Sequence, residues 1–90
     1  MPYTSEDSEV IGKVKDALKK MARTEIITET ENYLYAECTS FLFRFTDDLE
    51  VYVDSEKKLI HFRSASRVGH SDLGANRKRV ENLKSLLKGI

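Results

Sequence analysis

The feature that most constrains this fold is a pair of consecutive apolar patterns that agree on one buried face. Residues 46–48 and 54–57 can each turn the chain, and the segments around them alternate apolar and polar side chains. Aligned at these turns, both hairpins collect the same apolar face: Phe43, Phe45, Leu49, Val51, Ile60 and Phe62. Because successive side chains of a strand point to opposite faces, this agreement predicts an antiparallel sheet with one side buried and one facing water.

The same alignment gathers charged and polar side chains on the opposite face. These side chains are Arg44, Asp48, Glu50, Tyr52, His61 and Arg63. In this register Asp48 lies opposite Arg63, Glu50 lies opposite His61, and Val51 lies opposite Ile60. Cross-strand pairs of opposite charge contribute a few tenths to about 1 kcal/mol each. We interpret four side chains as a structural polar network: Asp47, Asp48, Arg63 and Asp72.

Two amphipathic helical patterns and two further strands complete the chain. The first apolar stripe consists of Val10, Ile11, Val14, Ala17, Leu18 and Met21. The second consists of Val80, Leu83, Leu87 and Ile90. We place the start of the second helix at Ser71 or Asp72, because both are good caps. The β-branched residues 24–30 and the alternating run 33–39 predict strands.

The element order is therefore αββββα, which predicts a single α+β domain over residues 1–90. We expect two layers, with an antiparallel sheet of about four strands and both helices on one face. Such a small domain has a thin core, but one large enough to fold without disulfides.

Charge balance and cysteine content limit the partners that we expect. The 15 basic and 15 acidic residues cancel, so no net field attracts nucleic acid or a membrane surface, and we expect neither as a partner. The single cysteine, Cys38, excludes an internal disulfide and a multi-cysteine metal site. It lies in an apolar-alternating run, which predicts a buried and unreactive thiol.

No targeting pattern stands at the N-terminus. Residues 1–7 lack the basic and apolar regions of a signal peptide, and no apolar run is long enough to span a membrane. We therefore expect a cytoplasmic protein. The sequence indicates no cofactor and leaves the oligomeric state open.

The most unusual composition lies in residues 63–79, between the last predicted strand and the second predicted helix. This segment holds five Lys or Arg residues and one acid. Backbone N–H groups collect at the start of a helix, and guanidinium groups bind phosphate or carboxylate through two parallel hydrogen bonds. We hypothesise an anion site there with these contacts: Arg63, Arg67, His70, Ser71, Asn76 and Arg77.

The same residues allow three interpretations other than an anion site. In a scaffold, Arg67 or Arg77 would be tied to Asp47 or Asp72 and would hold the loop against the sheet edge. A metal-dependent hydrolytic enzyme would use Asp47, Asp48, His70 and Asp72. A protein-interaction module would need no small ligand. No nucleophile elbow and no phosphate-binding loop motif supports an enzymatic assignment.

Two motifs carry a family resemblance. They are Phe43-Arg-Phe-Thr-Asp-Asp-Leu-Glu50 and Arg63-Ser-Ala-Ser-Arg-Val-Gly-His-Ser-Asp-Leu-Gly-Ala-Asn-Arg-Lys-Arg-Val-Glu81. Through them the chain resembles the family catalogued as domain of unknown function 1499, over roughly residues 33–83. The resemblance implies a compact α+β domain, and it implies no activity.

Overall fold

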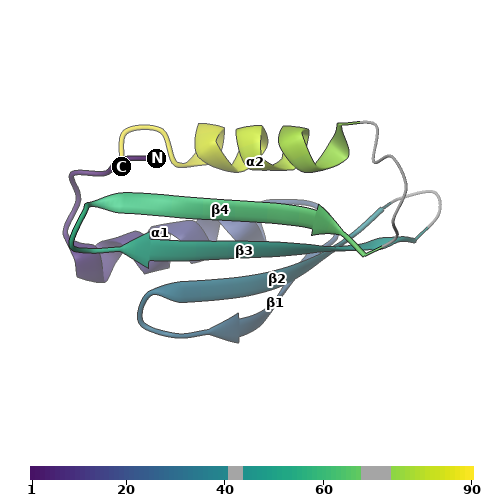
Figure 1. Cartoon of the computed structure of the whole chain (residues 1–90), viewed down its shortest axis with the longest axis horizontal. Coiled ribbons are helices and arrows are strands. Elements are labelled where there is room, and N and C mark those ends of the chain that lie inside the picture. Colours follow the sequence, from purple (N-terminus) through teal and green to yellow (C-terminus); the bar gives the residue numbers. More distant parts are fainter. Residues whose placement is uncertain (41–43, 68–73) are drawn as a thin grey trace.

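The computed structural model describes residues 1–40, 44–67 and 74–90, and these ranges form two helices and one sheet. In chain order the elements are α1 (Asp7–Lys19), β1 (Thr24–Glu29), β2 (Tyr33–Thr39), β3 (Thr46–Asp54), β4 (Leu59–Ser66) and α2 (Ala75–Leu86). The sheet order is β1-β2-β3-β4, and all three pairings are antiparallel. The predicted order αββββα and the α+β class are confirmed (Figure 1).

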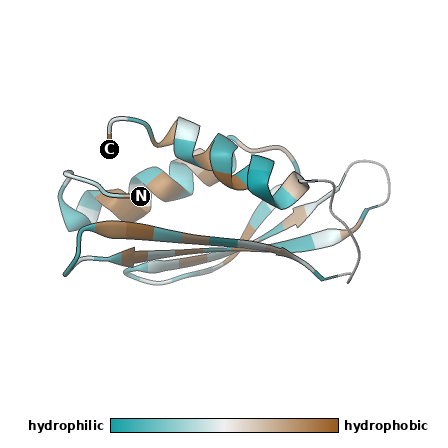
Figure 2. Cartoon of the chain, turned by 45° about the horizontal axis from the view of Figure 1, so that its top comes forward, coloured by the Kyte–Doolittle hydropathy of each residue, from teal (hydrophilic) through white to brown (hydrophobic). Residues whose placement is uncertain are grey.

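The core lies between one face of the sheet and the two helices. Both helices lie on the same side of the sheet, and their apolar stripes turn toward it (Figure 2). The buried hydrophobic side chains of the core are Tyr3, Val10, Val14, Ala17, Leu18, Leu34, Ala36, Cys38, Leu49, Val51, Val53, Ile60, Leu83, Leu87 and Ile90. In β2 and in most of β3, buried residues alternate with more exposed ones, as a sheet with one covered face requires.

The predicted hairpin at residues 46–48 is wrong. Residues 46–54 form one continuous strand, β3, which pairs with β2, so Ala36 faces Leu49. Phe45 precedes β3 and is 40% exposed, so it does not belong to the buried face. The predicted partner position Phe43 lies outside the described residues. The pairing with β2 gives β3 a longer ladder than a short strand at residues 41–45 could offer.

The predicted register between β3 and β4 is wrong by two residues. Val51 faces Phe62, whereas Ile60 faces Val53. A shift of two residues leaves every side chain on its predicted face, because side chains alternate with a period of two. The charge pairing changes, however, because Glu50 now lies opposite Arg63. Asp48 lies opposite Ala65, so the predicted cross-strand pair of Asp48 with Arg63 is not formed.

The helix α2 begins later than predicted. Its first residue is Ala75, and Gly74 precedes it in the left-handed region at φ 80°, a conformation that glycine adopts without strain. Ser71 and Asp72, the predicted caps, lie outside the described residues. The four residues 75–78 therefore form the first turn, which places Lys78 and Arg79 near the start of the helix.

The two ends of the chain meet beside β4. The backbone N–H of Ile60 donates to the Met1 carbonyl at 2.7 Å, and Pro2 forms a bridge with Leu59. At the other end, the Ser5 hydroxyl donates to the Ile90 carbonyl at 2.7 Å. These contacts fix the N-terminal segment along the first half of the outer strand β4.

Candidate functional site

A partly buried ion pair lies between the sheet and the start of α2. Arg79 Nη2 is 3.0 Å from Asp47 Oδ2, and the two side chains are only 14% and 10% exposed. Arg79 Nη1 donates to Ser64 Oγ at 3.0 Å and to Asn76 Oδ1 at 2.7 Å. Asn76 Nδ2 in turn donates to Ser66 Oγ at 3.0 Å. This cluster neutralises the one buried carboxylate of β3 and joins α2 to β4.

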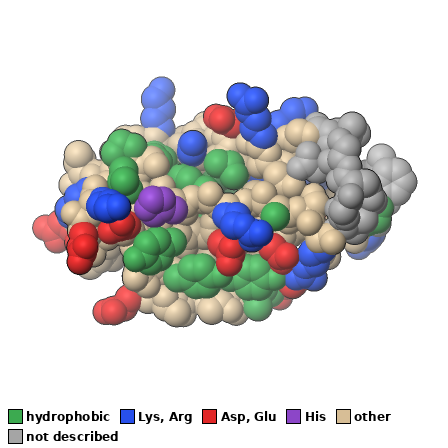
Figure 3. All heavy atoms as spheres, viewed as in Figure 1, with side chains coloured by type: hydrophobic (Ala, Val, Ile, Leu, Met, Phe, Trp, Pro, Cys, Tyr) green, Lys and Arg blue, Asp and Glu red, His purple; other side chains and the backbone are tan. Residues whose placement is uncertain are grey.

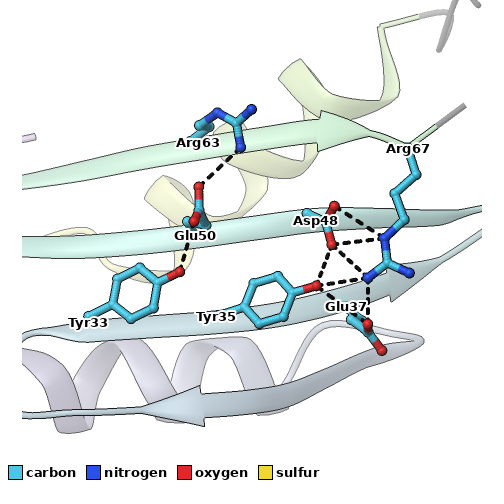
Figure 4. A network of polar contacts seen from close by, with 7 residues as sticks. All are labelled: Tyr33, Tyr35, Glu37, Asp48, Glu50, Arg63 and Arg67. Atoms are coloured by element: carbon cyan, nitrogen blue, oxygen red, sulfur yellow. Dashed lines mark hydrogen bonds and ion pairs between the residues drawn. The ribbon is translucent and has the colours of Figure 1, made fainter. Parts of the chain in front are cut away.

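A second polar network occupies the open face of the sheet, around Arg67 at the end of β4 (Figure 4). Arg67 Nη2 is 2.5 Å from Glu37 Oε2 and 2.8 Å from Asp48 Oδ1, and it also donates to the Tyr35 hydroxyl at 2.8 Å. The Tyr35 hydroxyl donates to Asp48. The guanidinium is therefore shared by two carboxylates and one phenol from β2 and β3.

These bonds shift the pKa values of the groups around Arg67. Hydrogen bonds from Arg67 and then from Tyr35 lower the pKa of Asp48. The bond to Asp48 is the largest cause that raises the pKa of Tyr35. The pKa of Arg67 is raised above its ordinary value by Asp48 first and by Glu37 next. All three shifts favour the ion pair, so the network stays charged at neutral pH.

A smaller chain of contacts lies next to this network on the open face. Arg63 Nη1 donates to Glu50 Oε2 at 3.1 Å, and the Tyr33 hydroxyl donates to Glu50 Oε1 at 2.8 Å. The rings of Tyr52 and His61 stack with centroids 5.9 Å apart. Figure 3 shows hydrophobic side chains of this face in a group beside the histidine, with acids and bases around them. Acids and arginines on this face largely satisfy each other.

A cationic cavity lies elsewhere, where the α1–β1 connection and the end of β2 approach α2. Its volume is about 460 Å³. It is lined by Met21, Ala22, Arg23, Thr24, Cys38, Thr39, Ser40, Ala75, Lys78, Arg79 and Asn82. Three of these residues are bases, and none of the described lining residues is an acid. Arg23 is held by a hydrogen bond from its Nε to the Thr39 carbonyl at 3.1 Å.

The predicted anion-site residues are not brought together within the described part of the chain. Arg63 and Arg67 lie on the open face of the sheet, where carboxylates engage both. Asn76 lies on the helix-facing side, in the cluster with Arg79. Arg77 is exposed on α2 and does not line the cationic cavity. His70 and Ser71 lie outside the described residues.

The cavity residues that the sequence prediction did not select come from distant segments. Lys78 and Arg79 belong to the basic segment 63–79. The composition therefore indicated the segment in which they lie, but not that these two residues line a cavity. Arg23 follows α1 and looks in the sequence like one more base at the end of a helix. No local pattern connects position 23 with position 78, because only the tertiary structure brings them to one cavity.

Two of the acids proposed as metal ligands, Asp47 and Asp48, do not converge, and Asp72 lies outside the described residues. Asp47 and Asp48 are consecutive in β3, so their side chains point to opposite faces of the sheet. Asp47 pairs with Arg79 on the helix side, and Asp48 pairs with Arg67 on the open side. Within residues 1–40, 44–67 and 74–90, no three His, Cys, Asp or Glu side chains group in a way that could hold a metal ion.

Cys38 is part of the core, as predicted. Its residue is 3% exposed, and the Thr24 hydroxyl contacts its Sγ at 3.7 Å. Burial raises the pKa of the Cys38 thiol, which keeps it protonated and poorly nucleophilic.

Fold and cavity together define a small α+β domain with an open antiparallel sheet face and a cationic hollow beside α2. A family model described as "Protein of unknown function (DUF1499)" matches residues 1–87, and the chain belongs to this family. The match extends well beyond the two motifs that carry the resemblance in the sequence. No curated protein matches the chain.

Neither helix of the described structure is long and apolar enough to cross a membrane. A cytoplasmic location and the lack of a nucleic-acid partner stay predictions from the sequence.

Proposed function

We propose that this domain binds a small anion, a phosphate or a carboxylate, in the cationic cavity beside α2. The observation that carries the proposal is the charge of the lining. Arg23, Lys78 and Arg79 converge on one hollow of about 460 Å³, and no acid stands among its described lining residues. Ligand sites of small molecules commonly have volumes of about 300–1,000 Å³.

Lys78 supplies positive charge to this cavity, beside Arg23. The charge of Arg79 is already balanced by Asp47 at 3.0 Å. Lys78, by contrast, takes part in no ion pair within the described residues. A hydrogen bond to a charged group contributes about 1.5–3 kcal/mol. Two such contacts in a shallow site support weak to moderate affinity, with Asn82 and nearby hydroxyls as neutral donors.

The geometry favours Arg23 and Lys78 over Arg67 as the main contacts. An anion at Arg67 would have to displace Asp48 or Glu37, which already hold the guanidinium at 2.8 and 2.5 Å. An anion at Lys78 displaces no carboxylate of the described residues, because Lys78 forms no ion pair among them. The contribution expected from His70 and Ser71 stays a prediction.

The test is a calorimetric and NMR titration with inorganic phosphate on wild type, Lys78→Gln and Arg77→Gln. Lys78→Gln should weaken binding about tenfold, which corresponds to about 1.4 kcal/mol. Arg77→Gln is the matched control, because it removes the same charge from the neighbouring residue of α2 but lies outside the cavity lining. Binding should also weaken as salt is added.

Two results would overturn the proposal. One is the absence of any phosphate-induced shift at residues 23–24 and 78–82 at tens of millimolar ligand. The other is a larger loss for Arg77→Gln than for Lys78→Gln, which would return the site to the residues predicted from the sequence.

A further inference from the structure

A second cavity borders the cationic cavity at the start of β1 and the end of β2. Its volume is about 580 Å³. It is lined by Arg23, Thr24, Glu25, Glu37, Thr39, Ser40 and Arg44. Four of these residues, Arg23, Thr24, Thr39 and Ser40, also line the cationic cavity. The two hollows therefore meet along a shared wall that carries three hydroxyl groups and one guanidinium.

The lining of the second cavity differs in chemistry from that of the first. Every described residue that lines it is polar, so it does not suit an apolar ligand group. Two acids balance two bases, so it attracts neither a second anion nor a cation strongly. Hydroxyls, carboxylates and guanidinium groups are the partners that polyhydroxylated molecules use, because each can accept from or donate to adjacent hydroxyl groups.

Glu25 is the carboxylate of this cavity that is available to a ligand. Glu37 is occupied by Arg67 at 2.5 Å. Glu25 lies directly opposite Glu37 in the register of β1 and β2, and like charges in facing positions destabilise a sheet. A ligand hydroxyl that donates to Glu25 would lessen this repulsion. Ser40 Oγ accepts from the Phe45 backbone N–H at 2.9 Å, so its own proton can be donated to a ligand where no described residue accepts it.

Backbone conformation points to the same place. Within the described residues, three non-glycine residues have positive φ: Arg23 at 53°, Arg44 at 57° and Lys58 at 55°. Two of the three, Arg23 and Arg44, line the second cavity. Non-glycine residues in the left-handed region are strained, and such residues concentrate at functional sites. This conformation is independent of the charge pattern.

We propose that the ligand is a phosphorylated polyol, such as a sugar phosphate. Its phosphate group occupies the cationic cavity with Arg23 and Lys78, and its hydroxylated body extends over Thr39 and Ser40 toward Glu25 and Arg44. This assignment rests on the proposed anion site, and it adds the class of molecule that carries the anion.

The test compares three probes on the whole chain: glucose 6-phosphate, ribose 5-phosphate and inorganic phosphate. At least one sugar phosphate should bind ten or more times more tightly than inorganic phosphate. Its titration should also shift the amide signals of Glu25, Glu37 and Arg44, which inorganic phosphate should leave in place. Unphosphorylated glucose should bind far more weakly than either ester.

Variants separate the two parts of the site. Glu25→Gln should weaken sugar phosphate binding about fivefold and leave phosphate binding unchanged, because Glu25 lines only the second cavity. Lys78→Gln should weaken both. Glu31→Gln, which removes an exposed acid in the β1–β2 turn outside both cavities, is the matched control.

The outcomes distinguish this inference from the proposed function. If phosphate binds and neither sugar phosphate binds at least threefold more tightly, the polyol assignment falls and the anion site remains. If no probe binds at tens of millimolar concentration, both fail. Equal effects of Glu25→Gln and Glu31→Gln on the sugar phosphate would also refute the role of the second cavity.

Discussion

The buried ion pair of Asp47 and Arg79 should be the polar contact on which stability depends most. The substitution Asp47→Asn keeps the shape of the side chain and removes its charge. The Arg79 side chain, which is only 14% exposed, then loses the carboxylate oxygen that lies 3.0 Å from its Nη2. Breaking a buried pair costs about 3–5 kcal/mol. The bonds of Arg79 to Ser64 and Asn76 remain, so we expect the lower end, about 3 kcal/mol.

Urea unfolding followed by circular dichroism measures this loss. With a slope of about 1.5 kcal/mol per molar urea, the midpoint should fall by about 2 M. Glu9→Gln is the control, because Glu9 and Lys13 are 59% and 50% exposed and lie 3.9 Å apart. Its cost should stay below about 0.5 kcal/mol.

A double-mutant cycle decides whether the loss belongs to the pair. Arg79→Met removes the charge that Asp47→Asn leaves without a partner. The loss of stability in the double variant should therefore be about 2 kcal/mol smaller than the sum of the two single losses. A loss below 1 kcal/mol for Asp47→Asn, together with no coupling, would refute the reasoning that this pair is buried and mutually dependent.

Two further predictions concern the open face and the core. Because bonds from Arg67 and Tyr35 lower the pKa of Asp48 in the folded state, its contribution to stability is present above about pH 4 and is lost as pH falls further. Asp48→Asn should therefore flatten the acid side of a stability profile measured by urea unfolding between pH 2 and 7, and an unchanged profile would contradict this. Cys38→Ala should cost about 1 kcal/mol of stability. A thiol reagent should label native Cys38 far more slowly than the unfolded chain, so rapid native labelling would contradict its burial.

The strands and their faces could be predicted from the sequence because they depend on local alternation. Leu49 and Val51 face the helices whichever partner strand they meet, since successive side chains of a strand point to opposite sides. The same alternation explains why the register of β3 with β4 was predicted less well. A shift by two residues keeps Ile60 and Phe62 on the same face, so the apolar pattern cannot distinguish the two alignments.

The tertiary structure decided that β3 begins at Thr46, within the turn that the sequence predicts at residues 46–48. Phe45 continues an apolar alternation, yet it lies outside β3 and is 40% exposed. Asp47, placed in a turn by its polarity, is a strand residue because Arg79 of α2 neutralises it beneath the helix. The partner of Asp47 lies more than 30 residues away along the chain, so its place in the strand is not visible locally.

The sequence by itself determined the order of the elements, the face of each strand and helix, the buried state of Cys38 and the existence of a basic segment before α2. These are properties of short segments, set by the spacing of apolar and charged side chains. Only the tertiary structure decided which charges pair and where a cationic cavity forms. Coulomb attraction and hydrogen bonds act over a few ångströms in space, so Arg67 pairs with Asp48. For the same reason Arg23 and Lys78, far apart in the sequence, line one cavity.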